Sequence, residues 1–277
     1  MKSKNQSCYF LEAIYSTIND GFTKKIKMLT KKTIHSFTRI ICLLTIFSAF
    51  LFMASSCRQS VKKYTENAKV LMSKGKFEEA IPILSTAIKK NSNSHEAYSL
   101  RGAAYLEIDK FEKAKKDLDK AIKLHKKDYR YFYNRAKAKK TLKEYQAAIE
   151  DYNKAIELNQ SNADMYLERG QLFLTLNKGN ESIKDLNQAV MLNASEKMAY
   201  FNRAEAHYLL HELKDAMTDL EKCLRLDEKF GKGHYRLAQI SLEINKNKAN
   251  RDICSHLKSA INGGCPEAKE LINKVCR

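Results

Sequence analysis

A period of 34 residues runs through most of this chain, and it restricts the possible folds more than any other feature of the sequence. Arginine, aspartate and small residues each recur at this spacing. The columns are Arg101, Arg135, Arg169 and Arg203; Asp117, Asp151, Asp185 and Asp219; Gly102, Ala136, Gly170 and Ala204; and Ala121, Ala155, Ala189 and Cys223. Because such periods are typical of solenoids, the sequence predicts stacked repeats that bury their apolar faces against one another.

Each repeat contains two stretches in which the apolar residues have helical spacing. Between residues 95 and 128, Tyr98, Gly102 and Tyr105 share one face of a first helix, and Leu118 marks the inner face of a second. The composition agrees, since 9 Gly and 2 Pro in 277 residues supply few of the turns that a strand-rich protein needs. The sequence therefore predicts an all-α protein.

These positions resemble the tetratricopeptide repeat, in which a small residue follows an aromatic one in the first helix and two alanines flank a large residue in the second. Residues 95–128 show this pattern as Tyr98, Gly102, Ala114, Leu118 and Ala121. The resemblance implies a right-handed superhelical solenoid of antiparallel helix pairs over residues 61–264. The expected units are 61–94, 95–128, 129–162, 163–196, 197–230 and a degenerate 231–264, followed by a capping helix at 265–277.

The segment before the repeats has the character of a secretory signal. Lys31, Lys32 and Arg39 precede an uncharged run, Ile40–Ser56, that is mostly apolar. Residues 28–56 are therefore expected to form a signal peptide that begins at Met28 as the true start of the protein. Residues 1–27 are then expected to come from a start site assigned too far upstream. An uncleaved N-terminal membrane anchor is the alternative, since a run of this length only just reaches the spanning range.

The small residues directly before Cys57 resemble a bacterial lipoprotein processing site. The resemblance implies cleavage before Cys57, attachment of lipid to this cysteine, and a short tether at residues 57–62. The expected location is the bacterial cell envelope, at the outer membrane facing the periplasm.

The net charge of the chain is +18, of which residues 1–57 carry +6 and residues 58–277 carry +12. We expect the charge of residues 58–277 to be spread over a lysine-rich helical surface, where acidic residues are mixed with the lysines. The Arg and Asp columns are expected to form exposed ion pairs, which are worth about 0–1 kcal/mol each. No nucleic-acid-binding motif is present, so nucleic acid is not an expected partner.

The C-terminal residues 250–277 have the pattern of two short antiparallel helices joined by a turn at Gly263, Gly264 and Pro266. Cys254 and Cys276 lie equally far from position 265, so such a hairpin brings their thiols together. In an oxidising compartment a disulfide between them is expected.

No motif in the chain predicts catalysis. His207 and His211 are four residues apart, but Tyr208 stands where a zinc protease needs glutamate. The sequence contains no glycine-rich phosphate loop and no nucleophile elbow. We therefore expect no catalytic residue, no metal and no cofactor.

The family resemblance implies a concave groove lined by the first helices of the units. Its candidate residues here are Arg130, Tyr133, Lys137, Lys140, Phe201, Glu205, Tyr208, Tyr235 and Gln239. The expected function is a non-catalytic protein–protein interaction scaffold that binds an extended or helical segment of a partner. Alternatively, Tyr133 or Phe201 packs between helices, and the basic surface recognises an anionic glycan or lipid. Asn134 and Asn202 match the central asparagine of a subtype of this family that binds the C-terminal carboxylate of its partner, called a carboxylate clamp. They lack the cationic neighbours that such a clamp needs, so no clamp is expected.

Overall fold

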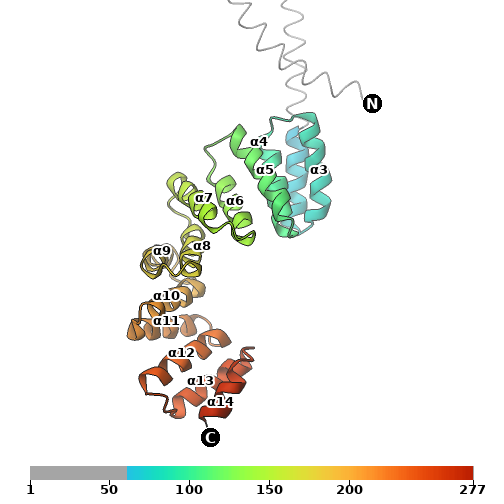
Figure 1. Cartoon of the computed structure of the whole chain (residues 1–277). Coiled ribbons are helices and arrows are strands. Elements are labelled where there is room, and N and C mark those ends of the chain that lie inside the picture. The colour runs from blue at the N-terminus through green and yellow to red at the C-terminus, as the bar shows by residue number, and fades with distance from the viewer. Residues whose placement is uncertain (1–60, 277) are drawn as a thin grey trace, which may run out of the picture. The chain divides into compact units, whose positions relative to one another are not determined.

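The computed structural model describes residues 61–276 (Figure 1). This range contains thirteen helices and no strand, which confirms the all-α solenoid expected from the sequence. The expected signal peptide, Cys57 and residues 1–27 lie outside it. Within residues 61–276, no helix combines the length and the apolar character needed to cross a bilayer.

The helices follow one another in pairs joined by short turns (Figure 1). A helix over residues 61–73 comes first. The others are α3 (Phe77–Lys90), α4 (His95–Glu107), α5 (Phe111–Leu124), α6 (Tyr129–Thr141), α7 (Tyr145–Leu158), α8 (Ala163–Thr175), α9 (Gly179–Leu192), α10 (Lys197–Leu209), α11 (Leu213–Leu226), α12 (Gly231–Ile244), α13 (Arg251–Asn262) and α14 (Ala268–Val275).

The chain divides into two compact units between Leu142 and Lys143, within the third predicted repeat. In the first unit, α4 packs against α3, α5 and α6. In the second, α8 packs against α7, α9 and α10, and the stack continues through α11 and α12 to α13 and α14. Every helix therefore buries its apolar face mainly against close neighbours in the sequence, as a solenoid requires.

The glycine positions of the period allow the two helices of a repeat to approach closely. A Cβ atom on Gly102 would lie 2.8 Å from Leu118 Cγ, and one on Gly170 would lie 2.9 Å from Leu186 Cγ. Leu118 and Leu186 are completely buried. The small-residue column thus sets the helix spacing around a leucine of the second helix.

First and second helices begin in different ways. Ser94, Asp128 and Asn162 each cap a first helix by accepting a hydrogen bond from a backbone N–H with the side chain. The second helices α3, α5, α7, α9 and α11 have no side-chain cap. Each instead follows a residue with positive φ, and these recur every 34 residues as Gly75, Asp109, Lys143, Asn177 and His211.

The Arg and Asp columns form ion pairs within the repeats. Nε and Nη2 of Arg203 donate to the two carboxylate oxygens of Asp219 at 2.7 and 2.6 Å, and Arg101 and Arg169 bind Asp117 and Asp185 in the same way. The aspartates are only 4–6% exposed. The expectation of exposed pairs is therefore wrong, because the carboxylates lie between the packed helices.

Each of these arginines also reaches the preceding repeat. Nη1 of Arg203 donates to Asn187 at 2.8 Å, and Nη1 of Arg169 donates to Asn153 at 2.7 Å. In the first unit, Nη1 of Arg101 donates to Ser85 at 2.9 Å. In these three repeats, one arginine thus links the second helix of its own repeat to that of the preceding repeat.

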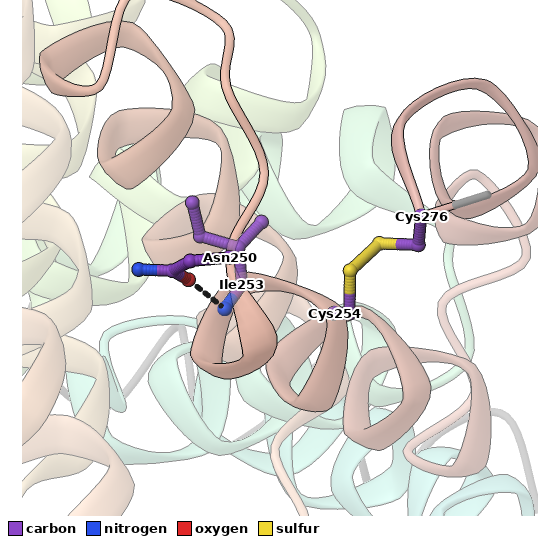
Figure 2. The surroundings of a disulfide bond; sticks show 4 residues. All are labelled: Asn250, Ile253, Cys254 and Cys276. Atoms are coloured by element: carbon purple, nitrogen blue, oxygen red, sulfur yellow. Dashed lines mark hydrogen bonds between the residues drawn. A yellow bond between two sulfur atoms is a disulfide. The ribbon is translucent and has the colours of Figure 1, made fainter.

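The last repeat departs from the period at Asn250. Its Oδ1 accepts a hydrogen bond from the backbone N–H of Ile253 at 2.9 Å, so Asn250 caps α13 instead of packing like the alanine of the other repeats (Figure 2). Cys254 near the start of α13 and Cys276 after α14 are joined by a disulfide, with Cα atoms 5.9 Å apart. That separation is ordinary for a disulfide.

The two other cysteines of the described residues are reduced and buried. Cys223 occupies the alanine column with no exposed surface, and burial raises the pKa of its thiol to about 11. Cys265 lies in the turn before α14, where its thiol donates to Glu267 at 3.1 Å. Neither cysteine has the low pKa of a reactive thiolate.

Candidate partner-binding groove

An open hollow of about 540 Å³ lies in the second unit, between the first helices of two successive repeats. α8 supplies one wall and α10 the other, with the turn residues Asn177 and His211 at one end. The lining side chains are Gln171, Leu174, Thr175, Asn177, Asn202, Glu205, Tyr208, Leu209 and His211. Two of the sequence-predicted groove residues, Glu205 and Tyr208, are therefore in its lining.

Arg236 on α12 organises the polar end of this groove. Its Nε and Nη2 donate to the two carboxylate oxygens of Glu205 at 2.6 and 2.8 Å, and its Nη1 donates to Gln239 at 3.1 Å. The guanidinium carbon lies 5.0 Å from the ring centroid of Tyr208. Three predicted groove residues thus meet around an arginine that the sequence analysis did not single out.

A signal for Arg236 was present in the sequence. It stands 34 residues after Asn202, in the column considered for a carboxylate clamp. The cation therefore stands in the same column as Asn202, one repeat later, and not among the positions that neighbour Asn202. In the structure this cation is paired with Glu205, so it does not provide a free carboxylate-binding site.

Phe201 and Tyr235 serve packing instead of lining this hollow. The Phe201 ring meets Phe230 edge to face, with centroids 5.2 Å apart, and it packs on the buried residues between α10 and α12. Tyr235 packs against the core around Leu257 that joins α12 to the C-terminal helices. Phe201 therefore packs between helices, which was the alternative to groove lining that the sequence left open.

The other candidates, Arg130, Tyr133, Lys137 and Lys140, belong to α6 in the first unit. Arg130 is exposed and binds the helix cap Asp128, with Nη2 2.6 Å from Oδ2. These hydrogen bonds raise the pKa of Arg130 above its ordinary value. Lys137 Nζ lies 5.8 Å from the ring centroid of Tyr133. Within the first unit, this face of α6 presents cations beside a half-buried aromatic ring.

One group in residues 61–276 has ligand atoms close enough to share a metal ion, namely His207, Glu212 and Asp215. His207 Nδ1 is 2.6 Å from Glu212 Oε2, and the two carboxylates are exposed. A hydrogen bond between the end of α10 and the start of α11 accounts for this contact. His211, the second histidine of the sequence pair, lies outside the group.

Three family models match the chain, and all describe repeats. A TPR repeat model matches residues 68–109 and 140–177, and two tetratricopeptide repeat models match 95–128 and 167–229. Comparison with curated protein sequences gave no significant match.

Solved structures share the fold at low sequence identity. MamA is 24% identical over 63% of this chain and 95% of its own, with a TM-score of 0.56. YrrB, described as a TPR protein with an unusual peptide-binding site, is 19% identical over 69% and 97%, with a TM-score of 0.59. The pilF protein of Pseudomonas aeruginosa is 14% identical over 79% and 99%, with a TM-score of 0.67.

At these identities the similarity to solved structures shows the fold alone. The family models together span residues 68–128 and 140–229, which is more than half of the chain. The chain therefore belongs to the tetratricopeptide repeat family.

Proposed function

We propose that this protein is a non-catalytic interaction scaffold of the bacterial cell envelope. It is anchored through lipid on Cys57 and binds an extended or helical segment of a partner protein in the groove of its second unit. The hollow between α8 and α10 carries this proposal, because it is an open surface on rigid helices with both apolar and hydrogen-bonding side chains.

The chemistry of the hollow favours an uncharged segment. Glu205 is neutralised by Arg236, and Asn177 and Asn202 line the hollow with uncharged amide groups. Leu174 and Leu209 add apolar surface. An extended segment could pair its peptide groups with the amides and place a small apolar side chain against the leucines. An acidic segment would find no free cation in this lining.

A cross-linking pull-down from intact membranes tests the groove. The variant Gln171→Arg with Leu209→Glu places two charges in the hollow at exposed positions. The matched control, Asn180→Arg with Leu226→Glu, introduces the same two charges outside the hollow, at exposed positions. Leu209 is 37% and Leu226 38% exposed, and both end a helix. The groove variant should lose the partner at least about tenfold while the control keeps it. Equal capture by both variants would place the binding site elsewhere.

Membrane fractionation tests the anchor. If Cys57 carries the lipid, Cys57→Ala prevents processing, and the lipid-modified form detected by mass spectrometry disappears. An unprocessed signal could still hold the variant in the membrane, so the N-terminal peptide is analysed in both proteins. A wild-type protein that begins at residue 1 or 28 and has no lipid would contradict the lipoprotein assignment in favour of an uncleaved anchor.

A further inference from the structure

Over residues 61–277, the net positive charge lies entirely in the first unit. Residues 61–142 contain 21 Lys and Arg against 10 Asp and Glu, a net charge of +11. Residues 143–277 contain 20 of each, a net charge of zero. The expectation that the charge is spread over the whole body is therefore wrong. Because both units have the same fold, the repeat architecture does not require this difference.

Four lysines of α5 contribute to this charge from one face of the helix. Lys113, Lys116, Lys120 and Lys123 are spaced three, four and three residues apart, which aligns them along a helix. The buried face of α5 carries Ala114, Leu118 and Ala121, so the lysine stripe lies on the side away from the core. Lys113, Lys116 and Lys123 are exposed, and Lys120 is half-buried.

Three of these lysines are unpaired. Within residues 61–276, no carboxylate lies at ion-pair distance from Lys116, Lys120 or Lys123. Asp119, which is next to Lys120 in the sequence, binds Arg135 at 2.7 Å. These three lysines thus present charges that no carboxylate of residues 61–276 pairs with, and such charges attract polyanionic surfaces.

The position of the first unit in the chain indicates which polyanion it meets. Val61, the first described residue, is already helical, and it lies four residues after Cys57 in the sequence. A chain held at Cys57 would therefore keep this unit within a few residues of the lipid headgroups. Lysines near an anionic lipid surface contribute roughly 1 kcal/mol each.

We propose that the first unit docks on an anionic phospholipid surface through the lysine stripe of α5, while the neutral second unit remains available for the protein partner. This inference rests on the proposed anchoring in the envelope. It does not involve the groove, so the two can fail separately.

Amine footprinting of the full chain in vesicles tests the proposal. The protein is reconstituted in pure phosphatidylcholine or in equal parts of phosphatidylglycerol and phosphatidylcholine, then acetylated with an activated ester and mapped by mass spectrometry. Labelling of Lys116, Lys120 and Lys123 should fall at least about threefold in the anionic vesicles and recover at high salt. The exposed Lys184, Lys214 and Lys258 of the second unit are the internal control and should not change.

Two results would overturn the proposal. Equal labelling of the stripe in both kinds of vesicle would show that it does not meet the lipid. Protection by soluble heparin in phosphatidylcholine vesicles, with none from phosphatidylglycerol, would assign the surface to an anionic glycan. Neither result depends on a protein partner, so the groove proposal stands or falls by its own pull-down.

Discussion

Arg203 and Asp219 show how single charged residues become part of the core of a repeat. Asp219 is 5% exposed and accepts two hydrogen bonds from Arg203, while the same guanidinium donates a third to Asn187 of the preceding repeat. The hydrogen bonds to Asp219 raise the pKa of Arg203 above its ordinary value. Losing the arginine would leave a buried carboxylate without its partner.

Arg203→Met is therefore expected to lower the free energy of unfolding by about 3 kcal/mol. Arg225→Met is the matched control, because Arg225 is 63% exposed and lies 4.0 Å from Glu221, a pair worth less than about 1 kcal/mol. Urea unfolding followed by circular dichroism measures both variants. Equal midpoints for the two would show that the buried pair contributes no more than a surface pair.

His234 and His256 form a second residue-scale feature, at the contact of α12 with α13. Their Nδ1 atoms are 2.9 Å apart, and His234 Nε2 lies 2.9 Å from the Glu228 carbonyl. Since a carbonyl only accepts, His234 carries its proton on Nε2 and accepts from His256 through Nδ1. Burial and then His234 lower the pKa of His256, against the opposing effects of Asp252 and Glu221.

This arrangement predicts a loss of stability in acid. The folded-state pKa of His256 is below the unfolded value of about 6.5. Above pH 6.5 the histidine is neutral in both states and costs no stability. Below that pH the unfolded chain binds the proton more readily, so the stability of the fold decreases. Amide exchange of α13 should therefore speed up between about pH 7 and pH 5 after correction for intrinsic rates. His256→Gln removes the titrating group and should reduce this change. An identical pH dependence in the variant would exclude the pair as its origin.

The turns between paired helices repeat a strained backbone conformation with positive φ. His211 has a φ of 60° in the turn before α11, a conformation that costs a residue with a side chain roughly 1–2 kcal/mol. Gly75 occupies the corresponding place in the first repeat at no such cost. The repeat geometry imposes this backbone conformation whichever residue stands there.

His211→Gly is accordingly expected to raise the free energy of unfolding by about 0.5–1 kcal/mol. Asn177→Gly at the equivalent turn should gain less, since asparagine tolerates the left-handed region. Thermal unfolding of the two variants measures the difference. Destabilisation by His211→Gly would mean that the imidazole contributes more than the backbone strain costs.

The C-terminal helices depend on their disulfide, because α14 has only eight residues and one buried residue, Ala268. Cys254 and Cys276 are 22 residues apart in the sequence, and such a cross-link contributes roughly 3 kcal/mol. Reductant should lower the stability of the wild-type second unit by about this amount and should leave Cys254→Ser with Cys276→Ser unchanged. If reductant left the stability of the wild-type second unit unchanged, the disulfide would not contribute to that stability.

For the whole molecule, the two units should respond differently to salt. The first unit carries +11 and repels itself, whereas the second has no net charge. Raising the salt concentration to about 0.5 M screens this repulsion, so amides of α4 and α5 should exchange more slowly. Amides of α9 and α10 are the internal reference and should change little. A uniform response along the chain would contradict the division of charge.

The helices, their pairing and the family follow from the sequence alone, because a 34-residue period places the same kinds of apolar and small residues in successive repeats. Its hairpin symmetry also paired the two cysteines that the structure joins. These features depend on contacts between close neighbours in the chain, and local spacing encodes such contacts directly.

Which side chains face one another across the stacked helices depends on the three-dimensional packing and could not be predicted. Glu205 and Arg236 are 31 residues apart and meet because α10 and α12 lie side by side. Asp219 is polar in the sequence but buried in the fold, and Phe201 turns into the packing instead of the hollow. Repeat spacing fixes the position of a residue on its helix, whereas burial and partners depend on the neighbouring helix, whose side chains change from repeat to repeat.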